Sequence, residues 1–395
     1  MKRRNIFGSY NAVLGLVFIV FGIFGVSSVI VMIRSDGFVP IEKIVAEQQK
    51  NAILFNSPLS SMYKHKLALH KERAANIVAI GSSRSHQFRA YAFSESFTNL
   101  GGVFGPLRYA ESFVRELIDV HKPGIIIWAI DYQDFFQAPG GAPLRTEDEK
   151  NIFSPLGLVV TGTLDWKSYW KLMFDGEVIE NFPVKLMGLS AKATGGGYDY
   201  DGSMYHFGRD YDVLGKGDIK HTNSRESLYR GIVENSSQGD RVNTVQPWAL
   251  AVFKSILDYA ASKNVIVIPV LVPSSPAVME ILDEKPDVFR RGLDELRQVL
   301  PRYSPHFADF VDPREYGSSE CEFLDAHHGG EVTYLRIMLG LSDMPGSPLK
   351  SYVRRDLIGR LIEDYENNIF ITEGRIGSQF KSAKRTRFSP MCRNK

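Results

Sequence analysis

The chain has 395 residues, of which 44% are apolar, and a formal net charge of +2 at pH 7. This length and apolar content can bury a large core, and the balanced charge gives no general attraction to nucleic acid. The two cysteines, Cys321 and Cys392, are too few for a disulfide framework, and their spacing does not fit a zinc site. A bridge between them is not favoured, because Cys392 lies in a tail that we expect to be loose.

The first predicted element is a membrane anchor. Ala12 to Ile33 form an uncharged stretch of 22 residues between the basic residues 2–4 and Arg34. At about 1.5 Å per residue, a helix of this length spans the roughly 30 Å hydrocarbon core of a bilayer. The stretch is longer than the apolar part of a cleavable signal peptide, so an uncleaved anchor is favoured over cleavage. The basic start predicts a single-pass protein of the cytoplasmic (inner) membrane whose remainder is extracytoplasmic, which in a bacterium is periplasmic.

An α/β domain is predicted to begin near residue 76, after a membrane-proximal connector at residues 35–75. The short apolar runs Ile77–Gly81 and Ile125–Ile130 are typical of buried strands in a parallel sheet. Residues 109–118 between them carry apolar side chains at helical spacing. This β-α-β rhythm predicts a doubly wound parallel sheet.

A large insertion is predicted at about residues 136–245, where the rhythm breaks and the chain becomes aromatic and rich in glycine. Aromatic rings such as those of Trp166 and Tyr198, beside acidic residues, suit sugar binding; the alternative is that they pack a small core of the insertion. The acidic residues of this region lack the spacing of a calcium loop, and we expect no metal ion and no cofactor. These residues are Asp199, Asp201, Asp210 and Asp212.

The α/β pattern returns after Pro247. The predicted elements are helices at residues 248–263, 289–300 and 334–341, and strands at residues 265–273 and 307–312. Pro269 indicates a bulge or a missing hydrogen bond in its strand. The domain is predicted to end near residue 345. Residues 346–395 are predicted to form a helix and then a basic tail, since seven Lys or Arg and one acid follow from Ile371 onward.

Two motifs carry the residues of a candidate catalytic site. Ser83 stands in Gly81-Ser82-Ser83 directly after the first strand, and Asp325 lies three residues before His328. Side chains at the carboxyl ends of parallel strands gather in one crevice. A serine hydroxyl needs a base to act as a nucleophile, and an Asp can orient and stabilise the imidazole of that base. The alternative reading is that Gly-Ser-Ser forms only a turn with a helix cap.

These motifs resemble those of the SGNH (GDSL-like) hydrolase superfamily. The resemblance covers about residues 75–135 and 245–340, and it implies a three-layer SGNH/flavodoxin-like fold. It assigns the nucleophile to Ser83 rather than to Ser82, and completes the triad with Asp325 and His328. The backbone N–H groups of Ser83 and Gly101 are implied as the oxyanion hole. The family's Gly-x-Asn-Asp block is missing, because the strand at Ile125–Ile130 is followed by Asp131 with no Asn, and one oxyanion donor has no assignment.

The resemblance and the predicted anchor together indicate an extracytoplasmic SGNH-like acyltransferase that forms a Ser83 acyl-enzyme. Its expected acceptor is an envelope or exported polysaccharide, and its expected partner is a membrane-bound O-acyltransferase, as in alginate O-acetylation and teichoic acid alanylation. The alternatives are a carbohydrate or lipid esterase and a non-catalytic polysaccharide-binding scaffold. The candidate substrate-binding residues are Arg84, Asp131, Trp166 and Tyr198.

Overall fold

The computed structural model describes residues 13–19, 22, 25–26, 29–30, 33, 36–57, 61–104, 107–136, 184–206, 244–284 and 290–371. The predicted span Ala12–Ile33 is therefore described only in part, and side chains there such as Leu16 and Phe18 are exposed. Within the described ranges, no helix is long and apolar enough to cross a membrane. The predicted basic tail after Ile371 lies outside the described residues.

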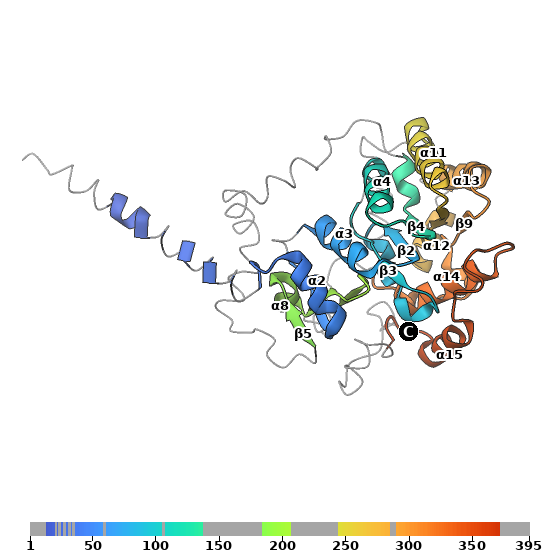
Figure 1. The fold of residues 1–395 in the computed structure, drawn as a ribbon. Coiled ribbons are helices and arrows are strands. Elements are labelled where there is room, and N and C mark those ends of the chain that lie inside the picture. The colour runs from blue at the N-terminus through green and yellow to red at the C-terminus, as the bar shows by residue number, and fades with distance from the viewer. Residues whose placement is uncertain are drawn as a thin grey trace, which may run out of the picture.

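Five parallel strands form the main sheet, in the order β3-β2-β4-β8-β9. Figure 1 labels β3, β2, β4 and β9 of this sheet. They are β2 (Ile77–Gly81), β3 (Phe97–Asn99), β4 (Ile125–Ile130), β8 (Ile266–Leu271) and β9 (Ala308–Asp309). Every residue of β2 and β4 is buried, as in a sheet covered on both faces. The predicted α/β class with a parallel sheet is confirmed, and the strand order is consistent with a doubly wound fold.

Helices cover both faces of this sheet. Because side chains alternate along a strand, Val78 and Ile80 of β2 join one apolar core, and Ile77 and Ala79 join the other. The first core contains α4 (Ala110–Val120), α11 (Pro247–Ser262), α12 (Pro276–Glu284) and α13 (Arg290–Val299). The second contains α14 (Glu331–Asp343) and α15 (Arg355–Tyr365). The sheet is thus the middle layer of three.

A second, smaller sheet joins the N-terminal part of the domain to the predicted insertion. Its order is β5-β1-β6-β7, built from β1 (Ile53–Phe55), β5 (Lys185–Met187), β6 (Gly196–Tyr198) and β7 (Met204–His206). The helices beside it are α2 (Ile41–Lys50), α3 (Met62–Arg73) and α8 (Leu189–Thr194). The segment predicted as a connector at residues 35–75 is therefore part of the folded protein, because β1 pairs with strands from residues 185–198.

Short 3-10 helices fill several connections. They are η1 (Ser83–Gln87), η2 (Ala90–Ala92), η3 (Leu107–Tyr109), η4 (Tyr132–Phe136), η5 (Leu300–Arg302), η6 (Pro313–Tyr316) and η7 (Glu320–Glu322). Cys321 in η7 is disulfide-bonded, although the sequence did not favour a bridge. The chain's other cysteine, Cys392, lies outside the described residues.

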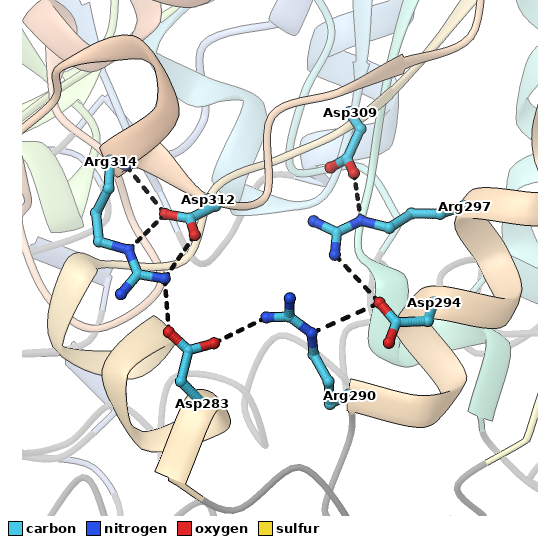
Figure 2. Close-up of polar contacts among 7 residues, drawn as sticks. All are labelled: Asp283, Arg290, Asp294, Arg297, Asp309, Asp312 and Arg314. Atoms are coloured by element: carbon cyan, nitrogen blue, oxygen red, sulfur yellow. Dashed lines mark hydrogen bonds and ion pairs between the residues drawn. The ribbon is translucent and has the colours of Figure 1, made fainter.

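Alternating acidic and basic side chains link α12, α13, β9 and η6 at one edge of the main sheet (Figure 2). Asp283 accepts from Arg290 at 2.9 Å and from Arg314 at 2.8 Å, and Arg297 reaches Asp309 at 2.5 Å. Such a network holds its elements together better than isolated surface pairs do. It fixes the chain that leads from β9 to the segment carrying Asp325.

Candidate active site

The nucleophile turn, which carries the predicted nucleophile Ser83, begins where β2 ends. Gly81 has a φ of 143°, and a Cβ atom there would lie 2.5 Å from the carbonyl oxygen of Ala129 on β4. Only glycine fits this position without displacing the neighbouring strand. Ser82 then caps η1, since its hydroxyl accepts a hydrogen bond from the N–H of Arg84 at 3.2 Å. The Ser82 hydroxyl is therefore engaged by the backbone of the turn, whereas Ser83 is exposed.

Asp325 and His328 lie on a tight loop before α14. The loop is closed at its base by an antiparallel bridge between Phe323 and Gly329 and by a 2.8 Å hydrogen bond from the N–H of Leu324 to the carbonyl of His328. Within it, Oδ1 of Asp325 accepts the backbone N–H groups of residues 327 and 328 at 2.8 and 2.9 Å. This Asp-centred turn sets the spacing between the carboxylate and the imidazole.

The two segments meet in a continuous hydrogen-bonded relay. The hydroxyl of Ser83 lies 2.8 Å from Nε2 of His328, and Nδ1 of His328 lies 2.8 and 2.9 Å from the two oxygens of Asp325. An ionised carboxylate only accepts, so Nδ1 carries a proton; in the neutral imidazole Nε2 is then the acceptor that faces the Ser83 hydroxyl. The structure thus brings together the three residues that the sequence predicted as a triad.

The electrostatics favour an ionised Asp325. Burial opposes ionisation, but the hydrogen bond and charge of His328, with the two backbone N–H groups, hold the pKa of Asp325 well below its usual value. Its neighbour His327 differs: burial, and then the charge of Arg84, lower the pKa of His327 to about 4. His327 is consequently neutral at neutral pH, and the structure assigns the contact with Ser83 to His328.

The predicted oxyanion hole needs a correction at Gly101. Its N–H donates to Oδ1 of Asn99 at 2.8 Å, so it is not available for a substrate oxygen in this conformation. The N–H of Gly102 donates to the carbonyls of Gly81 and Ser82 at 2.9 and 3.2 Å. In the part of the chain that the structure describes, the N–H of Ser83 has no acceptor and is available to donate to a bound group.

Asn99 is the residue whose side chain accepts the N–H of Gly101, and the sequence analysis did not identify it. Its side-chain amide donates to the carbonyls of Ser85 and Phe88 at 2.8 and 3.0 Å. That orientation is fixed by its surroundings, because reversing the amide would bring its oxygen against two carbonyl oxygens. Its position two residues before Gly101 is visible in the sequence, but the direction of its side chain is not.

Arg84 and Asp131, predicted to bind substrate, instead bind each other. Nη1 of Arg84 lies 2.7 Å from Oδ1 of Asp131, and the Arg84 side chain is buried. Nη2 of Arg84 donates to the carbonyl of Val272 at 2.9 Å and to that of Pro273, while the backbone carbonyl of Arg84 accepts from the hydroxyl of Tyr334. Arg84 therefore ties the nucleophile turn to the ends of β4 and β8 and to α14.

Tyr198, the other described candidate for substrate binding, is buried between the small sheet and α3. The amine of Lys66 lies 4.2 Å from the centroid of its ring, and its hydroxyl contacts the sulfur of Met62 at 3.2 Å. Its role is to pack the small sheet against α3. Trp166 lies outside the described residues.

No group of His, Cys, Asp and Glu within the described ranges is arranged to hold a metal ion. Asp199 accepts from the N–H of Tyr200 at 2.6 Å, and Asp201 accepts from the N–H of Ser203 at 2.8 Å and from the distant N–H of Ala90 at 2.8 Å. Both side chains are buried. Asp210 and Asp212 lie outside the described residues.

Neither the protein-family models nor the curated proteins contain a match to this chain. A serine hydroxyl, an imidazole and an ionised carboxylate in hydrogen-bond contact form an arrangement that can transfer acyl groups.

Proposed function

We propose that this protein is an SGNH-like serine O-acyltransferase or esterase. The observation that carries the proposal is the relay from Ser83 through His328 to Asp325, with both hydrogen-bonded steps at 2.8 Å. A surface serine seldom has a correctly oriented imidazole and a carboxylate behind it unless the hydroxyl is to be activated.

The mechanism follows from the proton positions. Ser83 Oγ attacks the carbonyl carbon of an acyl ester while its proton passes to Nε2 of His328. Asp325 stabilises the imidazolium, and the N–H of Ser83 donates to the oxyanion of the tetrahedral intermediate. His328 then returns the proton to the leaving alkoxide, and an acyl-enzyme ester remains on Ser83. A sugar hydroxyl, or water in the esterase case, loses its proton to His328 as it attacks this ester and releases Ser83.

The proposed setting is the extracytoplasmic face of a membrane, with an envelope or exported polysaccharide as acceptor and a membrane-bound O-acyltransferase as partner. The charge pattern around Ala12–Ile33 supports this orientation. The disulfide at Cys321 is a second support, because disulfides persist mainly in oxidising compartments. A reporter fused after Lys395 is expected to be active outside the cytoplasm, and activity inside would reject the setting.

The activity is tested with a fluorophosphonate label and an aryl acetate ester. Labelling and turnover are expected in the wild type and absent in Ser83→Ala. Ser82→Ala is the matched control: it removes the cap of η1 but leaves the relay, so labelling is expected to persist. Labelling of Ser83→Ala equal to wild type would reject the assignment. Faster ester consumption on addition of a polysaccharide acceptor then distinguishes a transferase from an esterase.

One observation favours a second candidate, a non-catalytic polysaccharide-binding scaffold. The engaged N–H of Gly101 leaves the oxyanion site with fewer donors than the resemblance implies. If wild type and Ser83→Ala are equally inert in both assays, and both bind the polymer, the scaffold is the better description.

A further inference from the structure

A fully buried ion pair lies behind the candidate active site. Nη2 of Arg89 is 2.5 Å from Oε1 of Glu331, and each side chain is 1% exposed. Asp201 is a further charged group that acts on both members of the pair. A buried ion pair of this kind adds little net stability, because the desolvation of two charges offsets their attraction. The pair instead restricts the two segments that carry Arg89 and Glu331 to one relative geometry.

The pair joins the two segments that carry the triad. Arg89 is six residues after Ser83 and directly follows η1 and its cap residue Phe88. Glu331 is three residues after His328 and is the first residue of α14. The backbone around it is also fixed, since Glu331 Oε2 accepts the N–H of Ile371 at 2.8 Å and the N–H of Glu331 donates to the carbonyl of Ile369 at 2.7 Å.

Arg89 also reaches the small sheet. Its Nη2 donates to the carbonyl of Met204 at 2.8 Å, and its guanidinium carbon lies 3.9 Å from the ring centroid of Tyr205 on β7. Asp201, just before β7, accepts the N–H of Ala90 at 2.8 Å. Three separate parts of the chain therefore converge on one side chain: the nucleophile segment, the start of α14 and β7.

We propose that Arg89 and Glu331 are positioning residues that hold Ser83 and His328 in register, with β7 of the small sheet as their third support. This inference rests on the proposed function, since it concerns the alignment of the same site. Neither side chain reaches solvent or the relay, so neither touches a substrate. Their removal is expected to change how fast a bound substrate reacts and not how tightly it binds.

The test replaces both members of the pair, Arg89→Met with Glu331→Met, so that no charge is left buried alone. The expected result is a folded protein whose kcat falls by about 10²-fold with KM unchanged, the size expected for a displacement of about 1 Å between reacting groups. Labelling of Ser83 by the fluorophosphonate is expected to slow in parallel. If the double variant does not fold, Arg89→Lys replaces it, because the lysine keeps the charge but loses the contacts with Met204 and Tyr205.

The control for general destabilisation is Leu296→Ala, a fully buried side chain of α13 in the core on the opposite face of the sheet. At a matched loss of thermal stability, this variant is expected to keep the wild-type kcat. A kcat for the pair variant equal to that of Leu296→Ala would overturn the proposal.

A second readout does not depend on turnover. The Nδ1–H proton of His328, bound to Asp325, is expected to give a downfield proton resonance, which should shift or broaden in the pair variant and remain unchanged in Leu296→Ala. An unchanged resonance in the pair variant would overturn the positioning role. If instead the wild type is inactive and unlabelled while the resonance shifts as expected, the proposed function fails and the positioning role stands.

Discussion

Two adjacent histidines in the active-site loop acquire opposite roles from their surroundings. His328 contacts Ser83 and Asp325, whereas His327 is held neutral by burial and by Arg84. We expect His328→Ala to lower kcat by on the order of 10³-fold or more, as for removal of a triad base. His327→Ala is the matched control and should lose little. Steady-state kinetics on the aryl acetate compare the two, and a dead His327→Ala beside an active His328→Ala would contradict the assignment.

The carboxylate behind the imidazole gives a second prediction. Asp325→Asn keeps an oxygen for the backbone N–H groups of the loop but offers Nδ1 of His328 a weaker, neutral acceptor. We expect kcat to fall by on the order of 10³- to 10⁴-fold. Since the two residues act as one unit, the double variant with His328→Ala should be no slower than the worse single variant. Additive losses in kcat would show that Asp325 acts independently of His328.

The candidate site shows which residue properties a sequence can reveal. The position of Gly-Ser-Ser after a strand and the short spacing of Asp to His indicated two candidate motifs, and the resemblance then selected Ser83, Asp325 and His328 within them. The contacts of Arg84 and Gly101 could not be predicted, because they depend on the directions of a side chain and of an N–H group, which contacts with other segments fix. An arginine after an exposed serine suggests substrate binding, but here the carbonyls after β8 and the charge of Asp131 draw it inward.

At the scale of the structural elements, the end of β2 leaves no room for a side chain at Gly81. Gly81→Ala would force a side chain into a left-handed backbone region and against the carbonyl of Ala129, so we expect a loss of about 2 kcal/mol or more in unfolding free energy. Gly359→Ala in α15 is the matched control, since a Cβ atom there meets nothing within 4 Å. It should gain about 0.5–1 kcal/mol from better helix propensity. Urea denaturation measures both, and equal effects would contradict this account.

The elements of the main sheet were easier to predict than those of the small one. Ile125–Ile130 is a continuous apolar run whose length alone favours a buried strand, and the structure has β4 there. Ile53–Phe55 has only three residues and shows no periodicity, and its partners lie beyond a long stretch of sequence. Pro269 was predicted to mark a bulge or a missing hydrogen bond. β4 and β8 pair without interruption through Pro269, so no bulge forms there. On the other side of β8, the pairing with β9 begins only at Val270.

For the molecule as a whole, Lys66 lies where the two sheets meet. Its amine donates to the carbonyls of Asn99 and Gly202, and burial lowers its pKa to about 7, against an opposing effect of Asp201. Between this value and the ordinary lysine pKa, the unfolded chain binds more protons than the folded one. The free energy of unfolding should therefore rise with pH above about 7, by at most on the order of 1 kcal/mol per pH unit.

Denaturant midpoints measured from pH 7 to pH 10 test this dependence. Lys66→Met should remove the rise, whereas Lys64→Met, an exposed lysine of the same helix, should keep it. Parallel pH profiles for the wild type and Lys66→Met would show that the amine at this junction is not the source.

The arrangement of the small sheet has a consequence for the order in which the protein matures. β1 lies between β5 and β6, and its first pair joins Ile53 to Lys185. Ile77 of β2 pairs with Ile125, which is much closer to it along the chain. At about 5–20 residues per second, a ribosome needs on the order of ten seconds to make the residues that separate β1 from β5. During that interval the apolar Ile53, Leu54 and Phe55 have no strand beside them. In refolding of the complete chain, the longer separation of β1 from β5 also makes this pairing slower to form than that of β2 with β4. In pulsed hydrogen exchange, the amides of β1 should therefore be protected after those of β2 and β4, and earlier protection of β1 would contradict this order.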